Sequence, residues 1–223
     1  MPVVTEIAIF DLLRDTDLLS PDSPSTVHLE ASFNILKQQK GFIQHFWGLK
    51  DEDATKLVVF IDWEDVTDHQ SFGNSEAYAT LGAELAKVVS FGNVPVMTHT
   101  NFTSDANVAR QAPVTAFKSF MLPEDATEEQ RSALEDAFLK LAQFNMTQTT
   151  CIGYACGWTL ETLPHDEAPS GKACVFNAII GWPSRKDFQE LRTIPGFKEA
   201  LQPVLGSSLK LRGQDMFHIN LNR

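Results

Sequence analysis

The chain has 223 residues, which fits one large domain or two small ones. Its apolar fraction of 43% supports a buried core, and 29 acidic against 18 basic residues give a formal net charge of −11. Because a surface of that sign repels phosphate groups and anionic lipid, neither nucleic acid nor a membrane is an expected partner.

The absence of several sequence motifs excludes further classes of protein. No apolar run is long enough to span a bilayer, and the N-terminus has the pattern of a first strand rather than of a secretion signal. The odd number of cysteines indicates free thiols and a reducing, cytoplasmic compartment: Cys151, Cys156 and Cys174. No nucleotide-binding glycine loop, CxxC, HxxxH or HExxH occurs, so we expect neither a metal ion nor a tightly bound cofactor.

The predicted elements occur twice in the same order. The first series has a strand at 4–13, a helix at 25–40, strands at 41–50 and 56–63, a helical region at 74–90 and a strand at 94–102. The second has a strand at 114–123, a helix from 127, strands at 149–161 and 173–182, a helical region at 193–206 and a strand at 213–221. This β-α-β-β-α-β order is that of a split βαβ, ferredoxin-like unit.

The two first helices differ in how clearly the sequence marks them. In the second series Thr127 and Gln130 have capping-box spacing and precede an apolar stripe at helical spacing: Leu134, Ala137, Phe138 and Leu141. Between 25 and 40 the apolar residues alternate as in a strand, whereas KQQKG at 37–41 resembles a basic last helical turn with a glycine cap. We interpret this segment as a helix.

A fixed offset relates the two series. Trp63 and Trp182 are 119 residues apart (182 − 63), and the same offset relates MTHTN at 97–101 to MFHIN at 216–220. We therefore predict two copies of one module, 1–105 and 112–223, joined by a polar linker. Two copies indicate a duplicated domain rather than a solenoid, which needs at least three repeats.

The segment WEDVTDHQSF, which begins at Trp63, together with SEAY at 75–78, resembles the antibiotic-biosynthesis-monooxygenase type of dimeric α+β barrel. The second copy matches in outline, but Phe188 stands where the first copy has His69. The resemblance implies an α+β fold in which two ferredoxin-like (βαββαβ) repeats form a pseudo-dimeric α+β barrel, with a homodimer as a further expectation. Haem is not expected, because Gly82 and Leu201 occupy the position of the haem-ligating histidine in related haem-cleaving proteins.

The last strand of each copy carries the candidate catalytic residues. Alternate strand residues face one side, so Met97, His99 and Asn101 share a face, as do the residues of the second copy: Met216, His218 and Asn220. We expect the helices on the opposite face, which would direct these side chains toward the barrel interior. A neutral imidazole there can accept a proton from a phenol or enol. Alternatively, histidine and asparagine only bridge the two sheets by hydrogen bonds.

Other side chains are candidates for binding an aromatic ligand. The tryptophans would form a stacking wall, or would only pack in the core: Trp47, Trp63, Trp158 and Trp182. Tyr154, Asn177 and Cys174 are expected to line the same interior, and His69 is either a site residue or a surface histidine.

These observations predict an enzyme that oxygenates a small aromatic or polyketide-like molecule without a cofactor. His99 or His218 would remove a proton, and Asn101 or Asn220 would orient the oxygen that reacts with the resulting anion. Two other classes stay open. One is a cyclase, lyase or isomerase that uses the same pocket, and the other is a non-catalytic, stress-associated barrel that binds a small molecule. Since Phe188 replaces the second histidine, only one copy is a complete candidate.

Overall fold

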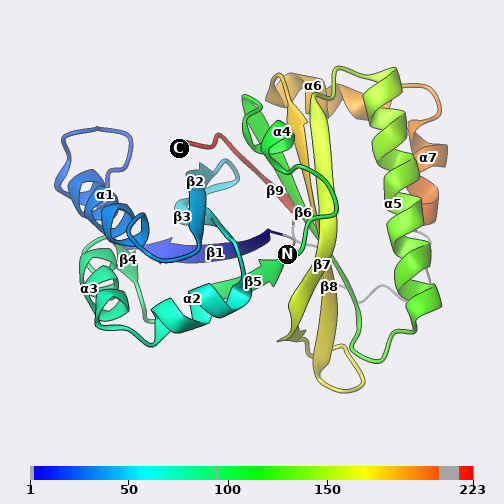
Figure 1. The fold of residues 1–223 in the computed structure, drawn as a ribbon. Helices are drawn as coiled ribbons and strands as arrows, with labels where there is room; N and C mark the ends of the chain where they lie inside the picture. The colour runs from blue at the N-terminus through cyan, green and yellow to red at the C-terminus, as the bar shows by residue number, and fades with distance from the viewer. Residues whose placement is uncertain (1–2, 94, 206–215, 223) are drawn as a thin grey trace. The chain divides into compact units, whose positions relative to one another are not determined.

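The computed structural model describes residues 3–93, 95–205 and 216–222. The chain divides into two compact units, Met1–Thr100 with Asn222–Arg223, and Asn101–Leu221 (Figure 1). No helix among the described residues is long and apolar enough to cross a membrane. The repeat boundaries predicted above, 1–105 and 112–223, stay a prediction.

The first unit is an antiparallel sheet with helices on one face. Its elements are β1 (Val4–Leu12), α1 (Pro24–Leu36), β2 (Phe42–Lys50), β3 (Asp53–Trp63), α2 (Val66–Gly73), α3 (Glu76–Leu85), β4 (Val89–Ser90) and β5 (Val96–Thr100). β3 pairs with β2 on one side and β1 on the other, and β1 pairs along its remaining edge with β5 and the short β4. α1 and α3 lie side by side (Figure 1).

The second unit repeats this arrangement after a short helix. Its elements are α4 (Asn107–Arg110), β6 (Val114–Pro123), α5 (Glu128–Gln148), β7 (Gly153–Pro164), β8 (Lys172–Trp182), α6 (Arg185–Glu190), the 3₁₀ turn η1 (Leu191–Thr193), α7 (Phe197–Leu205) and β9 (Met216–Ile219). The antiparallel strand order is β7-β8-β6-β9. Both units thus have the predicted β-α-β-β-α-β order.

The ambiguous segment at 25–40 is a helix, as predicted. Ser23 caps it by accepting a hydrogen bond from the backbone N–H of Thr26, and Pro24 occupies the first turn, where its missing N–H is harmless. Leu29, Phe33 and Leu36 are buried, whereas Val27 is 56% exposed. Positions 29, 33 and 36 have helical spacing, and these are the apolar residues that pack in the core. The strand-like alternation of apolar residues along the segment therefore did not decide its structure.

Three boundaries differ from the sequence prediction. Residues 66–73 form a separate helix, α2, and 89–90 form a strand rather than the end of a helix. The predicted linker contains α4, in which Ala109 and Arg110 are buried, so this segment is part of the second unit's packing. The predicted strand at 213–221 begins in residues outside the described part of the chain.

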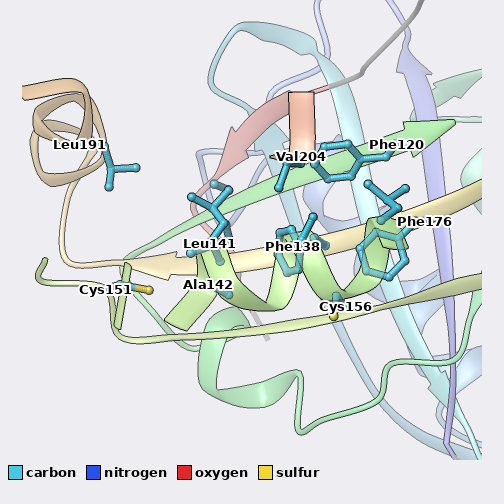
Figure 2. Packing of buried hydrophobic residues seen from close by; sticks show 14 of the residues in the cluster. Phe120, Phe138, Leu141, Ala142, Cys151, Cys156, Phe176, Leu191 and Val204 are labelled. Atoms are coloured by element: carbon cyan, nitrogen blue, oxygen red, sulfur yellow. The ribbon is translucent and has the colours of Figure 1, made fainter. Parts of the chain in front are cut away.

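Each unit has one main core between its sheet and its helices. In the second unit α5 carries the predicted capping box at Thr127 and buries Leu134, Ala137, Phe138 and Leu141 against the sheet. Figure 2 shows Phe138 of α5 among Phe120, Phe176 and Val204. The first unit packs Leu29, Phe33 and Trp63, among others, in the corresponding layer.

Phe138→Ala should lower the free energy of unfolding by about 3–5 kcal/mol, because Phe138 is 1% exposed and its removal leaves a cavity in a packed layer. Met146→Ala is the matched control, since Met146 is on the same helix but 39% exposed. Urea denaturation of both variants measures the difference. Equal effects of the two substitutions would show that α5 does not pack on the sheet in this register.

Candidate active site in the first unit

The first unit encloses a cavity of about 470 Å³ between its sheet and its helices. Strands β1 and β3 and helices α1, α2 and α3 supply most of the wall. The wall is mainly apolar, with side chains that include Phe10, Phe33, Phe72, Leu81, Phe91 and Met97. Four polar residues also line it: Glu6, Ser32, His69 and Tyr78. An apolar cavity of this size with a few polar groups is typical of a small-molecule site.

Glu6 is a buried carboxylate on the first strand. β1 alternates its side chains, so Glu6, Ala8 and Phe10 share the face that looks into the cavity. Glu6 is 5% exposed, and its Oε2 accepts a hydrogen bond of 3.0 Å from the indole Nε1 of Trp63. Because an isolated charge is costly to bury, this indole donor is part of what allows the carboxylate to remain in the core.

His69 lies on α2, which starts directly after the end of β3. Asp65 caps α2 by accepting from the backbone N–H of Thr67, and the helix then places the His69 ring over the indole of Trp63. The two ring centroids are 5.1 Å apart with an interplanar angle of 27°, a stacked arrangement. The indole at the strand end therefore supports both polar groups, with its N–H toward Glu6 and its face toward His69.

The two ring nitrogens of His69 contact different partners. Nδ1 lies 2.7 Å from Nε2 of His99, which is hydrogen-bond distance, and Nε2 lies 3.4 Å from Oε2 of Glu6. His99 is the cross-strand neighbour of Glu6, since β5 pairs with β1 in that register. We call Glu6, His69 and His99 the Glu-His-His cluster. A proton taken up at Nε2 of His69 gives an imidazolium that faces a carboxylate and can donate through Nδ1 to His99.

Tyr78 of α3 adds a hydroxyl to the cavity wall. Burial, and then the negative charge of Glu6, raise the pKa of its phenol above the usual value. The hydroxyl therefore stays protonated at neutral pH and is available as a hydrogen-bond donor.

Among the described residues, this cluster is also the one group of histidine, cysteine and carboxylate side chains whose ligand atoms lie close enough together to be considered as a metal site. One donor atom from each of Glu6, His69 and His99 lies within 4.8 Å of the others. Ligands on opposite sides of a zinc ion are at most about 4.2 Å apart, because each bond is about 2.1 Å. In the present arrangement His69 contacts His99 through Nδ1 and Glu6 through Nε2, and a metal ion would require the three side chains to rearrange.

The second unit lacks this cluster. Ala116 takes the place of Glu6, because it pairs with Ile180 and His218 as Glu6 pairs with Ile61 and His99. Phe188 stands in place of His69, with its ring 5.9 Å from Trp182 and 4.3 Å from His218. Without a carboxylate at 116, Nε1 of Trp182 is buried with no hydrogen-bond partner among the described residues. The equivalent place is thus occupied by apolar packing.

The predicted orientation of the last strand is wrong. The sequence analysis placed the helices opposite Met97 and His99, but Met97 lines the cavity and His99 contacts His69 on α2. Both side chains therefore face the helices of their own unit. Asn101 follows the end of β5 and does not line the cavity, and Asn220 is exposed. Met216 is 39% exposed and His218 is buried.

The tryptophans pack in the cores of the units rather than line the cavity of the first. Trp47 and Trp63 belong to the first core, and Trp182 and the half-buried Trp158 to the second. Trp158 donates to Glu135 at 3.3 Å. Trp63 nevertheless supports the site from behind, through its contacts with Glu6 and His69.

Tyr154, Cys174 and Asn177 do not share one surface. Tyr154 and Cys174 pack in the helix-covered core, whereas Asn177 accepts a hydrogen bond of 2.7 Å from Ser119 on the other face of the sheet. Strand alternation explains the separation, because 174 and 177 differ by an odd number of residues along β8. His28 of α1 lies 2.7 Å from Glu84 of α3 and is not part of the cluster.

Glu6 is the residue of the cluster that was not predicted from the sequence. It is 63 residues from His69 along the chain (69 − 6), so no short motif relates them. The sequence contained one signal. Glu6 stands in a strand of mostly apolar residues, and a buried glutamate is rare unless it has a partner. A second signal is the difference between the two copies, because the position equivalent to Glu6 in the second copy is Ala116.

No protein-family model matches the chain, and no curated protein matches it. Solved structures do match in fold. An anthrone oxidase-like protein has a TM-score of 0.66 at 15% identity, and the match covers 100% of this chain and 92% of that one. A candidate monooxygenase from Fusobacterium nucleatum has a TM-score of 0.59 at 11% identity, covering 100% and 93%.

The fold is that of the dimeric α+β barrels. The predicted fold class, α+β with two ferredoxin-like repeats of the pseudo-dimeric barrel type, is confirmed, and so is the resemblance in fold to the antibiotic-biosynthesis-monooxygenase type. A candidate chlorite dismutase matches almost as well, with a TM-score of 0.58 at 9% identity over 100% of this chain and 96% of that one. The same barrel therefore carries different named activities, and the reaction must be argued from the site.

Trp63→Phe should cost about 1–3 kcal/mol more in free energy of unfolding than Trp182→Phe. Both indoles are 0% exposed and both substitutions remove the same atoms, but only Trp63 donates to a buried carboxylate. Urea denaturation followed by circular dichroism measures both variants. A Trp182→Phe variant that is equally or more destabilised would show that the bond to Glu6 does not stabilise the first unit.

The three cysteines should be unreactive in the folded protein. All are free and buried, and burial raises the pKa of Cys151 and of Cys156 to about 11 and raises that of Cys174. The thiols therefore stay protonated at pH 8, where the reactive thiolate is scarce. A thiol-specific chromogenic reagent should modify none of them within minutes at pH 8 and all three in denaturant. Rapid modification in native buffer would contradict this burial.

Proposed function

We propose that the chain is an enzyme that removes a proton from a small, uncharged aromatic or polyketide-like molecule and lets the resulting anion react with O₂ without a cofactor. The observation that carries the proposal is the buried Glu-His-His cluster at one end of an apolar cavity. The fold similarity to an anthrone oxidase-like protein and to a candidate monooxygenase supports this choice of reaction.

His69 is the proposed general base, because it is the histidine of the cluster that lines the cavity. Its Nε2 accepts the proton of the substrate, and the carboxylate of Glu6 at 3.4 Å stabilises the positive ring that results. His99 is a positioning residue, since its contact at 2.7 Å fixes the orientation of the His69 ring. This assignment moves the base from His99, the sequence prediction, to its neighbour.

The substrate anion then reacts with O₂ in an apolar environment. For a methylene substrate, the carbanion forms a C–O bond with O₂ and regains the proton from His69, which gives a hydroperoxide. Loss of water from the hydroperoxide leaves a carbonyl group, so one methylene and one O₂ yield one carbonyl and one water. The reaction therefore needs no external reductant. Tyr78, which stays protonated, is a donor to the oxygen on which negative charge develops.

The charges of the site restrict the substrate. A buried carboxylate, Glu6, lies in a mainly apolar wall, so the cavity disfavours carboxylates and phosphates and favours an uncharged molecule. The aromatic side chains in the wall, Phe10, Phe33, Phe72 and Phe91, suit a planar ring system. A second copy of the chain as partner and a cytoplasmic location stay predictions of the sequence.

His69→Gln should lower turnover of an uncharged hydroxyaromatic or anthrone-type substrate by about 10²–10⁴-fold, the range lost when a general base is removed. His218→Gln is the matched control, because His218 holds the position of His99 in the unit where Phe188 replaces His69. It should retain activity within about threefold. Oxygen uptake and product formation are both measured.

Three outcomes separate the candidate classes. Turnover with stoichiometric O₂ uptake that depends on His69 supports the proposal. Turnover that depends on His69 without O₂ uptake would replace it with a cyclase, lyase or isomerase that uses the same base. Ligand binding with no turnover, unchanged in His69→Gln, would contradict both and leave a binding protein.

A further inference from the structure

The Glu-His-His cluster combines the donor types that bind transition metals. Nδ1 of His69 lies 2.7 Å from Nε2 of His99, and a carboxylate oxygen of Glu6 lies 3.4 Å from Nε2, the other nitrogen of the His69 ring. All three residues are largely buried, with side-chain exposures of 12% for His69 and 6% for Glu6. Imidazole nitrogen with one carboxylate favours zinc and similar borderline ions over magnesium, which prefers oxygen ligands.

Conversion of the cluster into a metal site requires the rings of His69 and His99 to separate and Glu6 to move toward Nδ1 of His69. In a tetrahedral zinc site two nitrogens lie about 3.3 Å apart, so the rings must separate by about 0.6 Å from their hydrogen-bond distance. Glu6 must bring one carboxylate oxygen closer by rotation of its side chain, while the other oxygen can remain near the indole of Trp63. The donors sit on β1, α2 and β5 around a stacked indole, so the backbone keeps them together.

We propose that this cluster is an inhibitory binding site for Zn²⁺, in which the ion is held by His69, His99 and Glu6 in place of their hydrogen bonds. A site with three protein ligands keeps a coordination position open, and here the cavity is adjacent to it. An ion bound at Nδ1 of His69, beside His99, leaves the ring proton on Nε2, so Nε2 can no longer accept a proton from the substrate. The inhibition rests on the proposed function, whereas the binding does not.

Isothermal titration of the substrate-free protein with Zn²⁺ tests the binding. We expect one ion per chain from the cluster, with affinity lowered about tenfold or more in His69→Gln, in His99→Gln and in Glu6→Gln, and no comparable site for Mg²⁺. Two matched controls should bind as the parent does. His28→Gln removes a partly exposed histidine that pairs with Glu84, and His218→Gln removes the buried histidine of the second unit.

Thermal unfolding gives a second readout that needs no substrate, since an ion that binds only the folded state raises the melting temperature. Zn²⁺ should raise it in the parent and in both control variants, and not in the three cluster variants. Equal Zn²⁺ affinity in parent and cluster variants would overturn the proposal, and so would loss of binding in His28→Gln. If Zn²⁺ binds at the cluster but His69→Gln keeps full turnover, the metal site stands and the proposed function fails.

Discussion

The hydrogen bond from the indole N–H of Trp63 to the buried carboxylate of Glu6 is the interaction on which the candidate site depends. A charged carboxylate in the sheet of a 223-residue chain is unfavourable unless it has donors around it. The same indole presents its face to His69, so one side chain contacts both Glu6 and the proposed base. The tryptophan at the end of the strand is thus a core residue whose N–H has a partner in the candidate site.

The two units show what that interaction does, because they share the order of their main elements and their strand register but differ at two positions beside the tryptophan. Where the first unit has Glu6 and His69, the second has Ala116 and Phe188, and the N–H of Trp182 is left without a partner among the described residues. Once the carboxylate is absent, an aromatic ring in place of His69 packs against Trp182 and His218 without cost in buried charge. One complete cluster per chain follows from this difference.

The sequence predicted the fold better than the site. The capping box at Thr127 and the order of strands and helices depend on local or periodic signals, and both are present in the structure. The site depends on contacts between β1, α2 and β5, whose register no local pattern encodes. The prediction therefore found His69 and His99 as separate candidates but not Glu6, the third member of the cluster. The prediction also assigned the helices to the wrong face of β5. Val96 and Met97 lie on opposite faces of this strand, and both are apolar, so polarity alone could not show which face the helices cover. In the structure both are partly exposed.

The most direct test is a crystal structure of the protein with an uncharged hydroxyaromatic or anthrone-type compound bound. The account predicts the compound in the cavity of the first unit, with its acidic atom about 3 Å from Nε2 of His69 and with Glu6 still accepting from Trp63. A compound that binds elsewhere, or a Glu6 side chain that points away from Trp63 and His69, would contradict it.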